Sequence, residues 1–315
     1  MFKYSKADLA SKAKEHGFVR DTLEKVFRLA DILDHLNANP LTKNTLALKG
    51  GTAINLTVFN LPRLSVDIDL DYSENCSREE MLLKRERITS DIKTHMTTQG
   101  YFLSEKSKYR HSLDSFIFVY QNLGGMNDNI KIEINYSLRC HIFELTHAPV
   151  LTGLFSSEKS VLSVAPMEIF AAKINALLSR AAARDLYDTY NMIILGLFNK
   201  TEYDLLRKSV VFYTAVSQES ISDEYDFNHI ESITRQKIKT DLLPVITRGE
   251  LVPLDDMKQT VKAFLSELLQ LTDDEKSFLV AFSQKEYSPE LLFDDKDILE
   301  RISNHPMVQW KMQEH

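Results

Sequence analysis

The sequence predicts an α/β first half, with a mixed sheet and helices, followed by an α-helical second half. Two segments, "VDIDLDY" and "NIKIEINY", alternate aliphatic with polar residues, which is typical of half-buried strands. After Pro166 the apolar residues recur at helical spacing instead. The chain has 315 residues, enough for two domains. We therefore expect a sheet domain over residues 1–160 and a helical domain over 161–315, the change falling between residues 155 and 166.

Composition and charge are those of an ordinary globular protein, with 43% hydrophobic and 26% charged residues. A net charge of −7 argues against broad electrostatic binding of nucleic acid. The charge is uneven, because residues 1–160 hold 21 Lys and Arg against 20 Asp and Glu, whereas residues 161–315 hold 17 against 25. A polyanionic partner is therefore expected at the first half or at the junction of the halves.

The sequence carries no sign of a membrane or secretory segment. No apolar run reaches 18 residues, and the first residues lack the apolar region of a signal peptide. The two cysteines, Cys76 and Cys140, form neither a disulfide scaffold nor a metal-type spacing. We expect a cytoplasmic protein that does not bind membranes.

Individual elements follow from periodicity and from turn residues. Amphipathic helices are expected within residues 6–36, and a highly charged helix over 77–99 begins with a capping box, "SREE". Strands are expected at 45–49, 64–72, 114–122 and 129–137, the last two forming a hairpin, with weaker strands at 141–145 and 160–166. A helical segment follows the first strand at 53–60, and helices are expected at 166–180, at 184–195 and, four to six more, over 201–315.

One face of the strand at 64–72 carries three aspartates, Asp67, Asp69 and Asp71. A solvated strand face is the simple interpretation. Two carboxylates about 4 Å apart repel by roughly 4 kcal/mol at an effective dielectric near 20, so converging aspartates need a cation. Oxygen ligands favour Mg²⁺ or Mn²⁺, and no histidine or cysteine in this segment favours zinc.

The strand at 129–137 places Lys131 and Glu133 on one polar face. If this strand neighbours the aspartate strand, Glu133 joins Asp67 and Asp69, and three carboxylates suit a two-metal phosphoryl-transfer site. The alternative is a routine cross-strand Lys–Glu pair.

The segment "KGGT" joins the first strand to a helical segment. Gly50 and Gly51 allow the backbone to approach a ligand closely, and a helix starting near Thr52, capped by that residue, offers free N–H groups to a phosphate. A tight turn without a ligand is the alternative. The segment does not have the P-loop pattern.

Four blocks in this order resemble the AbiEii/AbiGii toxin family of nucleotidyltransferase-like proteins: "LKGGTAINL…RLSVDIDLDY", "KIEINY", "PMEIFAAKINALLSRAAARDLYDTYNM" and "EYSPELLFDD…ERISNHPMVQWK". The resemblance covers nearly the whole chain. It implies a nucleotidyltransferase-like α/β lobe followed by an α-helical lobe that contributes to the active-site cleft.

The resemblance also implies roles for individual residues. Gly51 and Thr52 match the phosphate loop, Asp67 and Asp69 the metal-binding pair, and Lys131 and Glu133 a Lys-x-Asp/Glu block; Lys173 and Asp185 match residues of the first two helices of the second lobe. Two positions depart from the common pattern, Thr52 replacing serine and Glu133 replacing aspartate. The expected nucleotide-binding residues are Lys49, Gly50, Gly51, Thr52, Lys131 and Lys173; the catalytic residues are Asp67, Asp69, Glu133, Lys173 and Asp185; and the metal ligands are Asp67, Asp69 and Glu133.

The activity that the resemblance implies is transfer of a nucleotide from an NTP, with Mg²⁺ or Mn²⁺, to an acceptor hydroxyl at the tRNA 3′ end. Such a toxin of a toxin–antitoxin or phage-abortive system would block translation, and its antitoxin would be a transcriptional regulator that need not bind it. Two alternatives stay open at this point. The acceptor is a protein or a small molecule, or the chain is a nucleotide-binding interaction protein with little catalysis.

Overall fold

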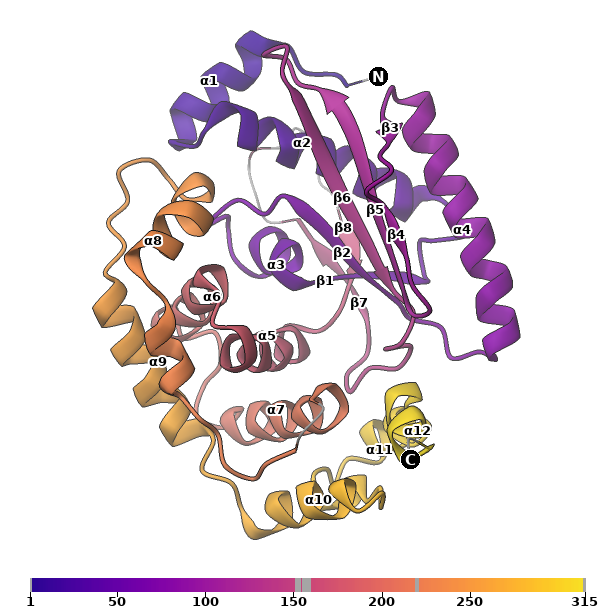
Figure 1. Ribbon diagram of the computed structural model, residues 1–315, viewed down its shortest axis with the longest axis vertical. Helices are drawn as coiled ribbons and strands as arrows, with labels where there is room; N and C mark the ends of the chain where they lie inside the picture. Colours follow the sequence, from indigo (N-terminus) through magenta and orange to yellow (C-terminus); the bar gives the residue numbers. More distant parts are fainter. Residues whose placement is uncertain (1, 151–153, 155–159, 219–220, 314–315) are drawn as a thin grey trace. The chain divides into compact units, whose positions relative to one another are not determined.

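The computed structural model describes residues 2–150, 154, 160–218 and 221–313 (Figure 1). The chain divides into two compact units. The first, here called the sheet unit, comprises Met1–Arg139, Leu145–Val164 and Pro244–Gly249. The second, here called the helical unit, comprises Cys140–Glu144, Ala165–Leu243 and Glu250–His315. Part of the residue range expected to contain the domain boundary, 155–159, lies outside the described residues.

The sheet unit is built on one mixed eight-stranded sheet, in the order β3-β5-β6-β2-β1-β8-β7, with β4 also paired to β5. Strand β2 runs parallel to β6 and β1 parallel to β8, while the other pairs are antiparallel. The strands are β1 (Leu46–Lys49), β2 (Asp67–Tyr72), β3 (Phe102–Leu103), β4 (Lys108–Tyr109), β5 (Leu113–Gln121), β6 (Asn127–Asn135), β7 (Thr146–Pro149) and β8 (Ser160–Ser163).

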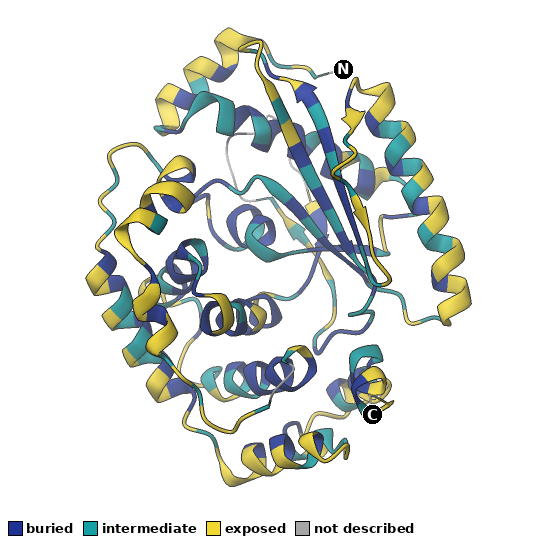
Figure 2. Cartoon of the chain, in the orientation of Figure 1, coloured by how far each residue is buried: buried dark blue, intermediate teal, exposed yellow. Residues whose placement is uncertain are grey.

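The predicted alternation is confirmed in β2 and β6. Ile68, Leu70 and the three isoleucines of β6 are buried, whereas the intervening polar side chains of β6 are partly or fully exposed. Figure 2 shows this alternation of buried and accessible residues along the central strands. One face of the sheet thus forms the apolar core, and the polar face is left for chemistry.

The long helices of the sheet unit agree with the sequence prediction, whereas the short helical segment expected at 53–60 begins earlier, at Gly50, and is largely π-helical. The helices are α1 (Lys6–His16), α2 (Arg20–Ala38), α3 (Gly50–Ala53), which continues as a π-helical turn over Ile54–Val58, and α4 (Arg78–Thr98). The capping box predicted for α4 is present, because the Ser77 side chain accepts from the Glu80 N–H and the Glu80 side chain from the Ser77 N–H.

The helical unit contains eight of the twelve α-helices found in the described residues. They are α5 (Pro166–Arg180), α6 (Ala183–Ile194), α7 (Tyr203–Ser217), α8 (Arg235–Lys237), α9 (Leu254–Leu268), α10 (Asp273–Ser283), α11 (Lys296–Ile302) and α12 (Pro306–Gln313). Proline occupies the first position of α5, where its missing N–H costs no hydrogen bond. Among the helices that are described, none is long and apolar enough to cross a membrane.

One predicted strand is absent, and three strands, β3, β4 and β7, were not predicted. Residues 141–145 are not a strand, because the Phe143 N–H donates to the Glu168 carboxylate (N–Oε2 3.2 Å) and not to a neighbouring strand. The adjacent segment forms β7 instead, and the two-residue strands β3 and β4 were not expected. Strands this short have too few residues for a periodic pattern.

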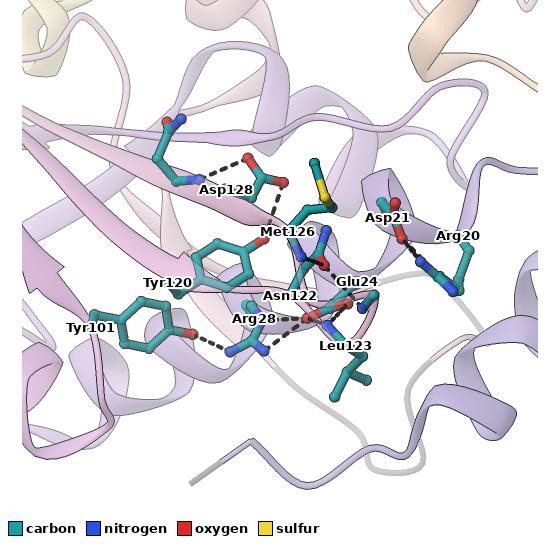
Figure 3. A network of polar contacts seen from close by, with 12 residues as sticks. Arg20, Asp21, Glu24, Arg28, Tyr101, Tyr120, Asn122, Leu123, Met126 and Asp128 are labelled. Carbon is teal, nitrogen blue, oxygen red and sulfur yellow. Dashed lines mark hydrogen bonds and ion pairs between the residues drawn. The ribbon is translucent and has the colours of Figure 1, made fainter.

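A buried ion pair ties helix α2 to the turn of the β5–β6 hairpin (Figure 3). Glu24 accepts from Arg28 Nε at 2.9 Å and from Nη2 at 2.8 Å. The same carboxylate accepts from the backbone N–H of Leu123 in the turn (N–Oε2 2.9 Å). Arg28 Nη1 also donates to the Tyr101 hydroxyl at 3.2 Å. Because β6 carries Lys131 and Glu133, this network fixes the strand that brings them to the site.

We expect Glu24→Ala to lower the free energy of unfolding by about 3–5 kcal/mol, since it leaves a buried guanidinium and a turn N–H without their acceptor. The matched control is Asp21→Ala, which removes the more accessible Arg20–Asp21 pair of the same helix and should cost about 0–1 kcal/mol. Urea unfolding followed by circular dichroism measures both changes. Equal effects of the two variants would contradict the assignment of this network as an anchor.

Candidate active site

The candidate site is built on the polar face of the central strands β1, β2 and β6. The strand register pairs Asp69 of β2 with Glu133 of β6 on one side and with Lys49 of β1 on the other. Asp67 pairs in the same way with Lys131. Residues paired across neighbouring strands point to the same face, so these five side chains share one face. We call Asp67, Asp69 and Glu133 the carboxylate row.

The surroundings of Asp69 disfavour the charged form of its carboxyl group. Burial raises the pKa of its carboxyl group, and repulsion by Asp67 and Glu133 raises this pKa further, while Lys49 and Lys131 act in the opposite direction. The strand register, which pairs Asp69 with Glu133 and places Asp67 two residues earlier on the same face, accounts for this repulsion. Among the described residues, no hydrogen bond or ion pair reaches the carboxylates of Asp67 and Asp69. The pair therefore holds negative charge that a cation would stabilise.

Two lysines of this face are engaged with carboxylates of their own. Lys49 Nζ lies 2.5 Å from Asp71 Oδ1, and Asp71 is only 3% exposed. Lys131 Nζ lies 2.6 Å from Glu133 Oε2. Asp71, for which the sequence offered no role, thus holds Lys49 beside Asp69.

The residues present fit a divalent metal that arrives with a nucleotide. The described part of the chain contains no group of three or more His, Cys, Asp or Glu side chains able to hold a metal ion. Because Glu133 is bonded to Lys131, the carboxylates without a partner are Asp67 and Asp69. Mg²⁺ is characteristically bound through one or two carboxylates together with substrate phosphates, which this pair can provide. Glu133 as a third ligand stays a prediction.

Both glycines of "KGGT" are required by close neighbours. Gly50 has φ +66°, and a Cβ there would lie 2.8 Å from Asp69 Oδ2. A Cβ on Gly51 would lie 2.7 Å from Arg63 Nη2. Any larger residue at Gly50 would collide with the carboxylate row, so the glycine allows the backbone of the loop to lie directly against Asp69.

The prediction that Thr52 caps a helix is wrong. Helix α3 begins at Gly50, and Thr52 lies inside it, 1% exposed. The Thr52 hydroxyl instead hydrogen-bonds the carbonyl oxygen of Asp67, and it lies 2.8 Å from Ser65 Oγ. Thr52 therefore joins the glycine loop to the start of β2.

Arg63 and Ser65 are neighbours of the loop that the sequence analysis missed. The Arg63 guanidinium is buried below Gly51, and its Nη1 donates to the carbonyl oxygen of Leu64 at 3.0 Å. The signal in the sequence is an arginine in the segment "NLPRLS", just before the aspartates.

In the helical unit, Lys173 and Asp185 are brought together as an ion pair, Nζ to Oδ1 2.8 Å, with Asp188 Oδ2 at 3.2 Å from the same Nζ. Lys173 is 8% exposed. Burial acts to raise the pKa of Asp185, but Lys173 and Arg180 outweigh it and the pKa is lowered. Arg180 Nε lies 2.7 Å from Asp185 Oδ2, with an exposed side chain. The charges of Lys173 and Arg180 thus lie against those of Asp185 and Asp188 within the helical unit.

The comparisons with known proteins place the chain in the class of nucleotidyltransferase-like proteins. The structure is similar to that of MenT4, a nucleotidyltransferase toxin from Mycobacterium tuberculosis H37Rv, with a TM-score of 0.66 and 17% identity over 97% of this chain and 99% of the other. The model of the family of AbiEii nucleotidyl transferase toxins, type IV toxin–antitoxin systems, matches residues 31–288, and the chain belongs to that family. No curated protein matches the sequence. The resemblance stated from the sequence is confirmed.

We expect Asp69→Asn to stabilise the metal-free protein. Because the folded pKa of Asp69 is raised, its ionisation costs stability as the pH rises through that pKa. Removing about 1 kcal/mol of this cost raises the melting temperature by roughly 2–4 °C in a chain of 150–250 residues, so a gain of a few degrees is expected here.

The gain should be present at neutral pH and disappear in acid, where wild-type Asp69 is protonated. Differential scanning calorimetry across pH measures it, with the conservative Asp273→Asn as an exposed control on α10. A variant that is less stable than the wild type at neutral pH would refute the strain assigned to Asp69.

Proposed function

We propose that the protein is a metal-dependent nucleotidyltransferase toxin that transfers a nucleoside monophosphate from an NTP to the 3′ end of tRNA and thereby blocks translation. The observation that supports this most strongly is the pair Asp67 and Asp69. Both carboxylates lack a partner among the described side chains, and the backbone of the glycine loop lies against Asp69. Carboxylates and a phosphate-binding loop in one place match the needs of a metal–triphosphate complex.

The triphosphate would bind to the Gly50–Thr52 loop, where the backbone comes closest to Asp69. Lys49 and Lys131 lie on the same face, so they add positive charge for the phosphates. By the family resemblance, Lys173 would also neutralise the charge of the triphosphate. Asp185 would orient a hydroxyl group of the nucleotide or of the acceptor. The Lys173–Asp185 ion pair supports this only in that it holds the two groups together and lowers the pKa of Asp185.

Asp67 and Asp69, with Glu133, would hold Mg²⁺ or Mn²⁺. A bound divalent ion supplies charge stabilisation for the attacking and leaving oxygens. The acceptor hydroxyl forms the new bond to the α-phosphorus, the α–β phosphoanhydride bond breaks, and pyrophosphate leaves with the electron pair. The proton of the hydroxyl passes to a base, and Glu133 is the carboxylate of the row that the structure places beside Asp69 on the same face.

The biological setting is part of the same proposal. A cytoplasmic toxin of this family would be controlled by a cognate antitoxin that acts as a transcriptional regulator and does not need to bind it. Its activity would serve abortive infection against phage. The family assignment is what supports this setting.

We expect Asp67→Asn/Asp69→Asn to lower the rate of nucleotide transfer by roughly 10²-fold or more, because the loss of the metal ligands removes several kcal/mol of charge stabilisation. Purified protein is incubated with Mg²⁺, each labelled NTP in turn and total tRNA. The matched double neutralisation Asp273→Asn/Asp274→Asn on exposed residues of α10 should leave the rate unchanged.

The acceptor is identified by the fraction that carries the label when RNA, lysate protein and small metabolites are offered together. If the protein or metabolite fraction carries the label, that fraction contains the acceptor and tRNA is not the acceptor. Full activity in a folded Asp67→Asn/Asp69→Asn variant would refute the proposed site.

A further inference from the structure

The polar face that carries the carboxylate row continues across the sheet to its open edge. Ser115 of β5 pairs with Glu133, and Lys108 of β4 pairs in turn with Ser115. One row of cross-strand neighbours therefore runs from Lys108 through Ser115 and Glu133 to Asp69 and Lys49. Residues in such a row point to the same face. Lys108 thus lies on the face of the candidate site.

A second row ends at the same edge in an aromatic side chain. Phe102 of β3 pairs with Val119 of β5, which lies on the same face of that strand as Ser115. Phe102 is 72% exposed. Its neighbour Leu103 pairs with Phe118 and so points to the opposite face. An exposed ring at a sheet edge offers a flat surface for stacking.

The edge is also positively charged, in contrast to a chain of net charge −7. The segment 102–110 contains three cations, Lys106, Lys108 and Arg110, against a single acid, Glu105, and all four side chains are exposed. Lys49 and Lys131 are paired with carboxylates. By contrast, no carboxylate among the described residues pairs with the three cations of the edge.

The spacing suits a short single strand of nucleic acid. Neighbouring strands lie about 4.8 Å apart, and Lys108 is three strands away from Asp69, which gives roughly 14 Å. At about 3.4 Å per stacked nucleotide, this corresponds to about four nucleotides. A strand end whose last hydroxyl lies at Asp67 and Asp69 would therefore have its preceding phosphates and bases at the edge.

We propose that Phe102, Lys106, Lys108 and Arg110, here called the edge platform, bind the single-stranded 3′ end of an RNA acceptor and direct it along the sheet to the carboxylate row. This inference rests on the proposed function and assigns the acceptor a place on the chain. The cations bind phosphates, and Phe102 stacks on a base. A protein strand added to this edge is a poorer fit, because β3 and β4 have only two residues each for main-chain pairing.

The probe is a fluorescein-labelled RNA hairpin with a short single-stranded 3′ end, and its binding to the full-length protein is measured by fluorescence anisotropy over a range of salt concentrations. Phe102→Ala should weaken binding roughly 5- to 150-fold, the loss of one stacked base. Lys106→Glu/Lys108→Glu should weaken binding and reduce the slope of log K against log salt by about 0.7 for each phosphate that is no longer neutralised.

Two matched controls are available in the sheet unit. Leu103→Ala alters the adjacent, exposed residue on the opposite face, and Lys14→Glu/Lys43→Glu reverses two exposed lysines that belong to neither β3 nor β4. Both should bind the hairpin as the wild type does. NTP binding should be unchanged in every edge variant, because the glycine loop and the carboxylate row are intact, and thermal melting checks the fold.

The outcomes separate this inference from the function on which it rests. If the wild type binds the hairpin and transfers nucleotides, and the edge variants do both equally well, the edge platform is refuted. The proposed nucleotidyltransferase activity would still stand. Transfer of label to protein or metabolites, with no binding of RNA by the wild type, would overturn both the RNA acceptor and the platform. Weaker binding of a blunt-ended hairpin than of the overhanging one supports the single-stranded 3′ end as the ligand.

Discussion

The crowding of negative charge around Asp69 is the constraint on which the rest of the site depends. Burial and two neighbouring carboxylates raise the pKa of Asp69, and sheet registry leaves no means of separating these groups. Gly50 follows from this, since any Cβ would meet the Asp69 carboxylate. Lys49 follows as well, because Asp71 holds it beside the row. Strained, under-neutralised carboxylates persist in a fold when a ligand completes them.

The two units differ in how far their described carboxylates are paired with cations. In the helical unit, Lys173 and Arg180 neutralise Asp185 and lower its pKa, so that cluster is electrostatically complete. In the sheet unit, Asp67 and Asp69 are left incomplete while Glu133 is matched by Lys131. Carboxylates without a cationic partner are candidates for binding substrate or metal. Carboxylates that are paired with cations also contribute to stability. A loss of activity on changing Lys173 would therefore have to be separated from a loss of folding.

The sequence allowed the local structure and the shared face of the carboxylates to be predicted, because strand alternation is a property of a few consecutive residues. The contacts that depend on how the strands pair could not be predicted from the sequence. The Lys49–Asp71 pair joins residues 22 positions apart, and the Thr52 hydrogen bond to Asp67 joins residues 15 positions apart. The burial of Arg63 arises from packing around the same loop. The two-residue strands β3 and β4 were missed for a related reason, since pairing with β5 defines them and their own pattern does not.

We propose that Asp67 and Asp69 hold a divalent metal together with a nucleotide at the glycine loop. Crystals grown with Mn²⁺ and a non-hydrolysable NTP analogue test it most directly by anomalous diffraction at the manganese edge. We expect a manganese peak in contact with the carboxylates of Asp67 and Asp69 and with the triphosphate, and no such peak in Asp67→Asn/Asp69→Asn. Manganese and nucleotide bound away from these carboxylates, or bound equally well in the variant, would contradict it.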